Sequence, residues 1–237
     1  MSDICKKDML AILGTAPSLS MAPYDDEKFE IWGVSTLLEF EKAKRLDVLF
    51  EMHSDGYWGR QDVTKRLKRW AGPLYMREKV KLFPNSKTYP LDDVLKYGRY
   101  HTTTITYMMA LAYHSYIETG KPFHVGLYGV HMEHDEEYGI QRPCCEYWLG
   151  KMQGAGIDTM VAPGGALLES SGLYGYENYN PICLDLKQRI LALHETEEKF
   201  REQEREAARN AEQHIGAQKE AQFILRMIQR GQSSQGA

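Results

Sequence analysis

A short apolar run near the start of the chain does most to limit the folds available to it. Residues 9–13, Met-Leu-Ala-Ile-Leu, lead directly into the small-residue loop Gly14-Thr15-Ala16-Pro17-Ser18. A continuous apolar run bounded by glycine is typical of a strand buried on both faces, as in a parallel sheet. Backbone N–H groups in the loop after such a strand can bind an anion, for example a nucleotide phosphate. The alternative for this loop is a tight strand-to-helix turn.

Apolar runs and helical patterns alternate through the first part of the chain. We expect strands at 9–13, 30–34, 47–51, 80–83, 124–130 and 158–162. Helical patterns separate several of them, at 37–45, 63–70, 104–118 and 138–154. This alternation predicts a Rossmann-like α/β domain at 1–183, with a mostly parallel sheet and helices on both faces. Ligands of such sheets bind beyond the carboxyl ends of the strands, near a switch point in strand order.

The composition changes from residue 184 onward. Leu186, Ile190, Leu193 and Phe200 recur at helical spacing, and a Glu-, Arg-, Gln- and Ala-rich stretch follows them. We expect a long helical extension at 184–230, kinked or broken near Gly216, and a disordered tail at 231–237. Its last apolar cluster, 223–228, needs a partner surface, either on its own domain or on another subunit of a homo-oligomer.

Composition and charge exclude several classes of protein. A hydrophobic content of 43% with 11% aromatic residues supports a packed core. The net charge of −4 makes nucleic acid an unexpected partner. The basic run Lys65-Arg66-Leu67-Lys68-Arg69 is interpreted as a solvated helix face, with a local basic patch as the alternative.

The chain contains no apolar stretch of the roughly 20 residues that a membrane span needs, and its first residues do not resemble a signal peptide. Cys5, Cys144, Cys145 and Cys183 form no spaced framework, so they are interpreted as reduced thiols. We therefore expect a cytoplasmic protein, in the host cytoplasm if a phage encodes it.

Three polar clusters follow or precede the expected elements. The first is the Gly14–Ser18 loop, and the second is Thr102-Thr103-Thr104, where hydroxyl groups at a helix N-terminus suit either phosphate binding or ordinary capping. The third follows the strand at 124–130 and contains His131 and His134 among carboxylates. These histidines are candidates for a general base, for metal ligands or for hydrogen-bonded structural residues. Weaker candidates at the same sheet edge are Ser35, Glu51, His53 and Asp55.

The order of these clusters resembles the bacterial oligosaccharide sialyltransferases and a wider group of Rossmann-like proteins with a Gly-Pro-Ser loop, including small proteins of tailed phages. The matching residues are Gly14, Pro17 and Ser18, then Thr102–Thr104, Gly129-Val130-His131 and His134-Asp135-Glu136-Glu137-Tyr138. The resemblance implies that the first loop holds the phosphate and ribose of a CMP-linked sugar. It also implies that His134 acts as general base on the acceptor hydroxyl. Ser35 stands where the family has an asparagine that contacts the nucleotide.

Together these observations predict a nucleotide-binding transferase, with a nucleotide sugar as the candidate donor for a glycosyltransferase. His134 and His131 are the catalytic candidates, and the nucleotide would be held by Gly14, Thr15, Ser18, Ser35 and Thr103. We expect no tightly bound cofactor and assign no metal ligands, because the nucleotide or nucleotide sugar is itself the substrate. The alternative is a non-catalytic Rossmann-like assembly protein, associated with a phage, that oligomerises through its C-terminal helix.

Overall fold

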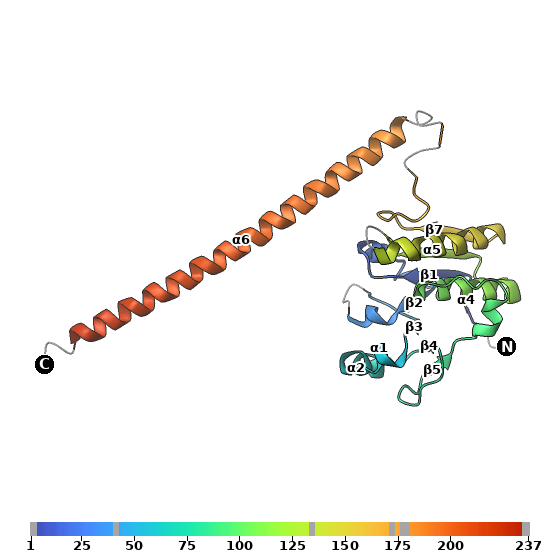
Figure 1. Cartoon of the computed structure of the whole chain (residues 1–237), viewed down its shortest axis with the longest axis horizontal. Helices are drawn as coiled ribbons and strands as arrows, with labels where there is room; N and C mark the ends of the chain where they lie inside the picture. Colours follow the sequence, from blue (N-terminus) through green and yellow to red (C-terminus); the bar gives the residue numbers. More distant parts are fainter. Residues whose placement is uncertain (1–3, 40–42, 133–135, 171–173, 176–180, 234–237) are drawn as a thin grey trace. The chain divides into compact units, whose positions relative to one another are not determined.

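The computed structural model describes residues 4–39, 43–132, 136–170, 174–175 and 181–233 (Figure 1). The chain divides into two compact units, Met1–Glu169 and Ser170–Ala237. The first unit contains the sheet and its covering helices, and the second contains one long helix. Each unit is described by itself below.

The first unit is built on a seven-stranded sheet in which every described pair of neighbours is parallel. The order across the sheet is β5-β4-β3-β2-β1-β6-β7. The strands are β1 (Met9–Leu13), β2 (Phe29–Val34), β3 (Val48–Glu51), β4 (Leu74–Met76), β5 (Ser86–Thr88), β6 (His124–Tyr128) and β7 (Asp158–Val161). The predicted Rossmann-like fold is therefore confirmed.

The strand order reverses beside β1, which pairs with β2 on one side and with β6 on the other. The chain adds strands outward from β1 to β5 and then crosses back to place β6 on the opposite side of β1. The carboxyl ends of β1 and β6 thus flank the switch point at which open α/β sheets bind ligands. Leu13 and Tyr128 are register partners there.

Helices cover both faces of the sheet, as the buried residues of each strand require. The crossover helices are α1 (Asp55–Trp58), α2 (Gln61–Arg69), α3 (Leu91–Leu95), α4 (Thr104–Thr119) and α5 (Glu136–Gly154), with short 3-10 helices η1 (Pro17–Met21) and η2 (Ser35–Glu39). Leu10 and Ile12 of β1 pack into the cluster that contains α4 and α5. Ala11 and Leu13 pack on the opposite face, with residues of η1 and η2. The alternation of β1 side chains between the two faces therefore builds both layers.

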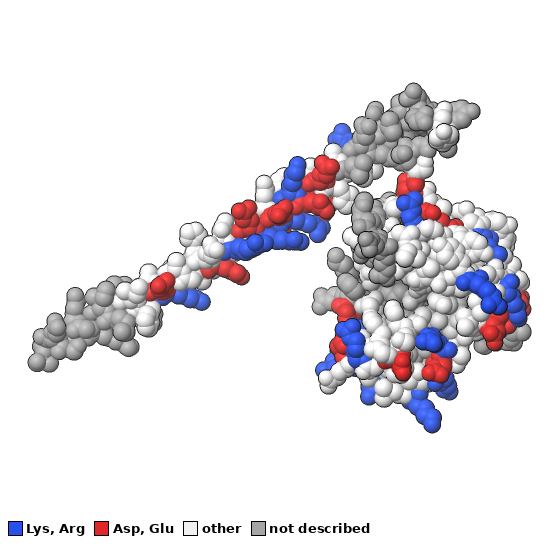
Figure 2. Space-filling model, in the orientation of Figure 1, with Lys and Arg blue, Asp and Glu red and all other residues white. Residues whose placement is uncertain are grey.

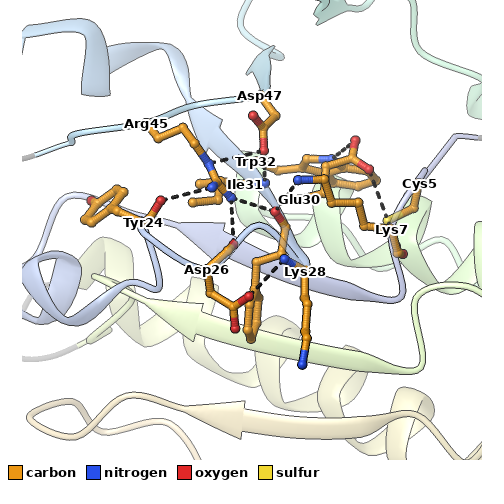
Figure 3. Close-up of polar contacts among 11 residues, drawn as sticks. Cys5, Lys7, Tyr24, Asp26, Lys28, Glu30, Ile31, Trp32, Arg45 and Asp47 are labelled. Carbon is orange, nitrogen blue, oxygen red and sulfur yellow. Dashed lines mark hydrogen bonds and ion pairs between the residues drawn. The ribbon is translucent and has the colours of Figure 1, made fainter.

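The amino ends of β1 and β2 are tied together by a polar network (Figure 3). The Arg45 guanidinium donates to the backbone carbonyls of Tyr24 and Phe29 at 2.9 and 2.6 Å. The buried Glu30 carboxylate accepts hydrogen bonds from Trp32 Nε1 at 3.0 Å and from the backbone N–H of residue 6 at 2.6 Å. These bonds satisfy a buried charge at the end of the sheet opposite the switch point.

The cysteines of this unit are buried thiols. Cys5, Cys144 and Cys145 are free, and each is about 1% exposed or less. Burial, followed by neighbouring negative charge, raises the pKa of the Cys5 and Cys145 thiols well above the ordinary value. They are therefore protonated core residues.

Two expected elements are absent. Residues 80–83, expected as a strand, form a turn, and the strands lie on either side of it as β4 and β5. The apolar side chains of this turn have a packing role, because Phe83 is buried with residues of α2 and β4. The helix expected at 37–45 is reduced to η2, and the described residues 43–46 are not helical. Arg45 instead donates to the carbonyls of the preceding loop.

The second unit contains α6 (Pro181–Ser233), which is longer than the expected helix. It continues through Gly216 without the predicted break, because a single glycine inside a long helix costs only about 1 kcal/mol relative to alanine. Positive and negative side chains are interspersed along its described middle part (Figure 2), where Arg201 pairs with Glu197 at 2.7 Å. Within the described part of the chain, no helix is both long and apolar enough to cross a membrane.

Candidate functional site

A cavity of about 500 Å³, here called the central cavity, lies at the carboxyl ends of the strands around the switch point. Its walls come from the loops after β1, β2, β3 and β6 and from the start of α4. The predicted residues among its lining are Gly14, Thr15, Ser35, Thr103 and His131. Sequence positions that are up to 117 residues apart in number, from 14 to 131, are thus brought to one cavity by the parallel sheet.

The floor of the central cavity is formed where the loops after β1 and β6 cross. Gly14 N–H donates to the carbonyl of Tyr128 at 2.8 Å, and Ala16 N–H donates to that of Gly129 at 3.0 Å. A Cβ on Gly14 would lie 2.3 Å from the carbonyl oxygen of Gly129, and a Cβ on Gly129 would lie 2.6 Å from that of Gly14. Gly129 also has φ of +67°, which favours glycine. Gly14 is therefore required by the crossing of two backbones.

Ser18 and His131 form a pair across these loops. Ser18 Oγ accepts a hydrogen bond from Gly129 N–H at 2.9 Å and lies 2.8 Å from His131 Nε2. Ser18 is only 5% exposed and is not among the residues that line the central cavity, whereas His131 lines it. A Cβ on Gly165 would lie 2.6 Å from the Cα of His131, so this glycine lets the loop after β7 pack directly on the histidine. Ser18 therefore acts on the cavity by holding His131.

Thr103 is placed at the N-cap of α4 with an extended backbone, at φ −152° and ψ 156°. Its side chain makes no capping hydrogen bond, although threonine at this position usually bonds the backbone of the first turn. Thr102 and Thr104 line the central cavity beside it. The start of α4 thus presents hydroxyl groups and the positive end of a 16-residue helix to the cavity, a combination that favours an anionic group.

A buried carboxylate connects the loops after β2 and β3. Glu51 is 1% exposed; its Oε2 accepts a hydrogen bond from Ser35 Oγ, and its Oε1 accepts from His53 Nδ1 at 2.6 Å and His53 N–H at 3.0 Å. Burial raises the pKa of the Glu51 carboxyl, but the hydrogen bonds from His53 and Ser35 outweigh it and hold that pKa below its ordinary value. Glu51 is therefore ionised at neutral pH and orients the His53 ring.

A second cavity of about 670 Å³, here called the lateral cavity, lies beside the ends of β3 and β4. Its lining combines aromatic and charged side chains, and His53 belongs to the lining of both cavities. The residues around it are Met52, His53, Ser54, Asp55, Trp58, Met76, Arg77, Glu78, Val80, Tyr89, Leu91 and Tyr107.

The predicted catalytic residue His134 lies outside the described residues. Met132, two positions before it, lines the central cavity with φ of +53°, a backbone conformation that is unusual for a residue other than glycine and costs about 1–3 kcal/mol. Sequence reasoning assigned no role to Gln141 or Thr36, which also line this cavity. Thr36 follows a predicted strand and was accessible to that reasoning, whereas Gln141 comes from inside a helix and carried no local signal.

No group of three or more His, Cys, Asp or Glu side chains capable of holding a metal occurs among the residues that the structure describes. The roles of the cavity must therefore be considered from the side chains already named.

No protein-family model matches the chain, and no curated protein matches it. Two solved structures of the sialyltransferase CstII from Campylobacter jejuni are similar to it. The complex with a substrate analogue, CMP-3FNeuAc, has 14% identity and a TM-score of 0.44, and covers 68% of this chain and 82% of that chain. The complex with cytidine-5'-monophosphate has 16% identity and a TM-score of 0.43, with the same coverage. CstII is a sialyltransferase, the kind of protein that the sequence motifs resemble.

Proposed function

We propose that this chain is a nucleotide-binding transferase that takes a nucleotide sugar as its donor. One observation carries the proposal: four of the residues predicted to hold a nucleotide, Gly14, Thr15, Ser35 and Thr103, line a single cavity at the switch point of the sheet. An open parallel sheet binds its ligand at this place. The volume of about 500 Å³ is within the range of small-molecule sites.

The phosphate of the donor would lie against the start of α4. Thr103 has a hydroxyl group that does not cap the helix, and the N-terminus of the helix favours a negative charge. The resemblance of the Gly14–Ser18 loop to the sialyltransferase loop supports a nucleoside at the opposite wall. His134 remains a prediction of that resemblance, and His131, held by Ser18, remains the second catalytic candidate.

A thermal-shift screen with CMP, CDP, UDP, GDP and ADP tests this proposal. A ligand that binds only the native state stabilises it by about 2.7 kcal/mol at 100 times its dissociation constant, which is visible as a higher melting temperature. We expect one base to give a clear shift, and we expect Thr103→Val and Thr15→Val to reduce it. Thr88→Val, a threonine of the edge strand β5 outside the cavity, is the matched control.

A screen in which none of these nucleotides changes the melting temperature would contradict the proposal. The assembly alternative would then stand, and one feature favours it independently. Several large apolar side chains of α6 are between 49% and 65% exposed, namely Leu186, Ile190, Leu193, Phe200, Ile215, Phe223 and Ile224. We infer that α6 associates with a second copy of this chain, and this association is compatible with either function.

A further inference from the structure

The lateral cavity and His53 lie outside every role assigned above. We propose that the lateral cavity binds a saccharide acceptor and that His53, oriented by Glu51, accepts the proton of the acceptor hydroxyl. This inference rests on the proposed transferase function and names its second substrate and its base.

The position of His53 carries the first step of the argument. Its side chain lines the central cavity and the lateral cavity, so it lies where a molecule in one would meet a molecule in the other. A two-substrate transferase needs a group at this junction, because donor and acceptor must be in contact when the bond forms. The His53 side chain is 55% exposed, so a proton that it accepts can pass to solvent.

The hydrogen bonds of His53 determine which nitrogen can act. The Glu51 carboxylate is ionised and can only accept, so Nδ1, at 2.6 Å from it, carries the hydrogen in the neutral ring. The lone pair of the neutral imidazole is then on Nε2. A buried carboxylate that holds the Nδ1–H of a histidine also stabilises the imidazolium that forms when Nε2 takes a proton. Ser35 donates to the other oxygen of Glu51 and completes this support.

The lining of the lateral cavity indicates the class of acceptor. Trp58, Tyr89 and Tyr107 supply aromatic rings, and Asp55, Arg77 and Glu78 supply charged groups that form strong hydrogen bonds. A saccharide has apolar C–H faces that pack on aromatic rings and hydroxyl groups that bond to carboxylates and guanidinium groups. Because both signs of charge are present, we assign a neutral saccharide with free hydroxyl groups.

The transfer step balances with these groups alone. The acceptor hydroxyl oxygen forms a bond to the anomeric carbon of the donor sugar, and the bond from that carbon to the phosphate oxygen breaks. The electron pair of the broken bond leaves on the phosphate of the nucleotide. The hydroxyl proton passes to Nε2 of His53 and then to water.

Acceptor binding can be tested on the full chain without a donor. Saturation-transfer NMR with methyl β-galactoside, methyl β-glucoside and lactose should show binding of at least one of them to the wild-type protein. We expect Arg77→Ala to weaken that signal, whereas Lys79→Ala, an exposed basic residue that lines neither cavity, should leave it unchanged. The absence of binding by all three saccharides, or equal binding by the Arg77→Ala variant, would overturn the assignment of the lateral cavity.

The role of His53 is tested by acceptor-dependent release of the nucleotide from the donor that the thermal-shift screen identifies. We expect His53→Gln, which keeps an N–H donor for Glu51, to lower this rate by about 10²–10⁴-fold while the melting shift with nucleotide is unchanged. The His53→Ala variant should regain part of its rate with added imidazole, an effect that a purely structural role does not produce. His194→Gln, an exposed histidine of α6, is the control.

The two proposals fail in different ways. If no nucleotide shifts the melting temperature, the transferase function fails and only saccharide binding bears on the lateral cavity. If nucleotide binds but His53→Gln transfers within about threefold of the wild-type rate, His53 is not the base. Loss of transfer in His134→Ala with normal transfer in His53→Gln would likewise overturn the inference in favour of His134.

Discussion

At the scale of the residue, Gly14 and Gly129 show why the site has its present form. Each glycine allows the backbone of the other to approach closer than any Cβ would permit. This contact holds together the loops after β1 and β6, which carry Thr15 and His131 to the central cavity. A loss of ligand binding in a Gly14 variant would therefore report a distorted site, and hydroxyl variants such as Thr103→Val are the better probes.

We predict that Gly14→Ala lowers the free energy of unfolding by about 2–3 kcal/mol, because the added Cβ overlaps the Gly129 carbonyl and forces the two loops apart. Urea unfolding followed by circular dichroism measures the change. Gly150→Ala is the matched control: this exposed glycine of α5 has no neighbour within 4 Å, so alanine there should stabilise the helix by up to about 1 kcal/mol. An unchanged unfolding midpoint for Gly14→Ala would show that the crossing is looser than described.

At the scale of the element, α4 joins the core to the site. Its first residues line the central cavity, and its body is buried on several sides against β1, β2, β3 and α5. Its apolar residues therefore surround the helix instead of forming one stripe, as expected for a helix inside the core. Gly120, with φ of +78°, ends it. The packing of this helix determines where Thr103 stands.

We expect Leu111→Ala to lower the free energy of unfolding by about 2–5 kcal/mol, since Leu111 is fully buried and its truncation leaves a cavity. Ile117, on the same helix, is 47% exposed, and Ile117→Ala should cost about 0.5 kcal/mol or less. Denaturant titrations of the two variants provide the comparison. Equal losses for the two positions would mean that α4 is not packed as the structure has it.

At the scale of the whole molecule, the two units have different roles in our interpretation. The unit Met1–Glu169 contains the sheet, the three hydrophobic clusters and both cavities. The unit Ser170–Ala237 contains α6, whose exposed apolar side chains are available for association. Catalysis and assembly can therefore be separated along the chain.

We predict that a fragment ending at Glu169 folds with a melting temperature within a few degrees of the full chain, because its core is internal to it. Calorimetry and light scattering after size exclusion give the melting temperature and the mass. The full chain should run as an oligomer and the fragment as a monomer, with the same nucleotide-induced shift in both. An oligomeric fragment would place association outside α6, and a fragment that fails to fold would show that the units depend on each other.

Much of the fold could be predicted from the sequence because its signals are local. The apolar run at 9–13, the capping threonines before α4 and the change in composition near residue 184 each reflect neighbouring residues, and the structure has β1, α4 and α6 there. The short strands β4 and β5 were missed because three residues are too few for a periodic pattern to develop.

The sequence by itself determined the class of fold and the loops that end its strands, because burial on both faces and glycine at a strand end leave a local pattern. Only the tertiary structure decided which of those loops meet. It joined Ser35 to Glu51 and His53, and Ser18 to His131, through the order of parallel strands. Strand order is set by the packing of residues far apart in the chain, so no local pattern encodes it. The candidate base His53 emerged only when those loops were placed side by side.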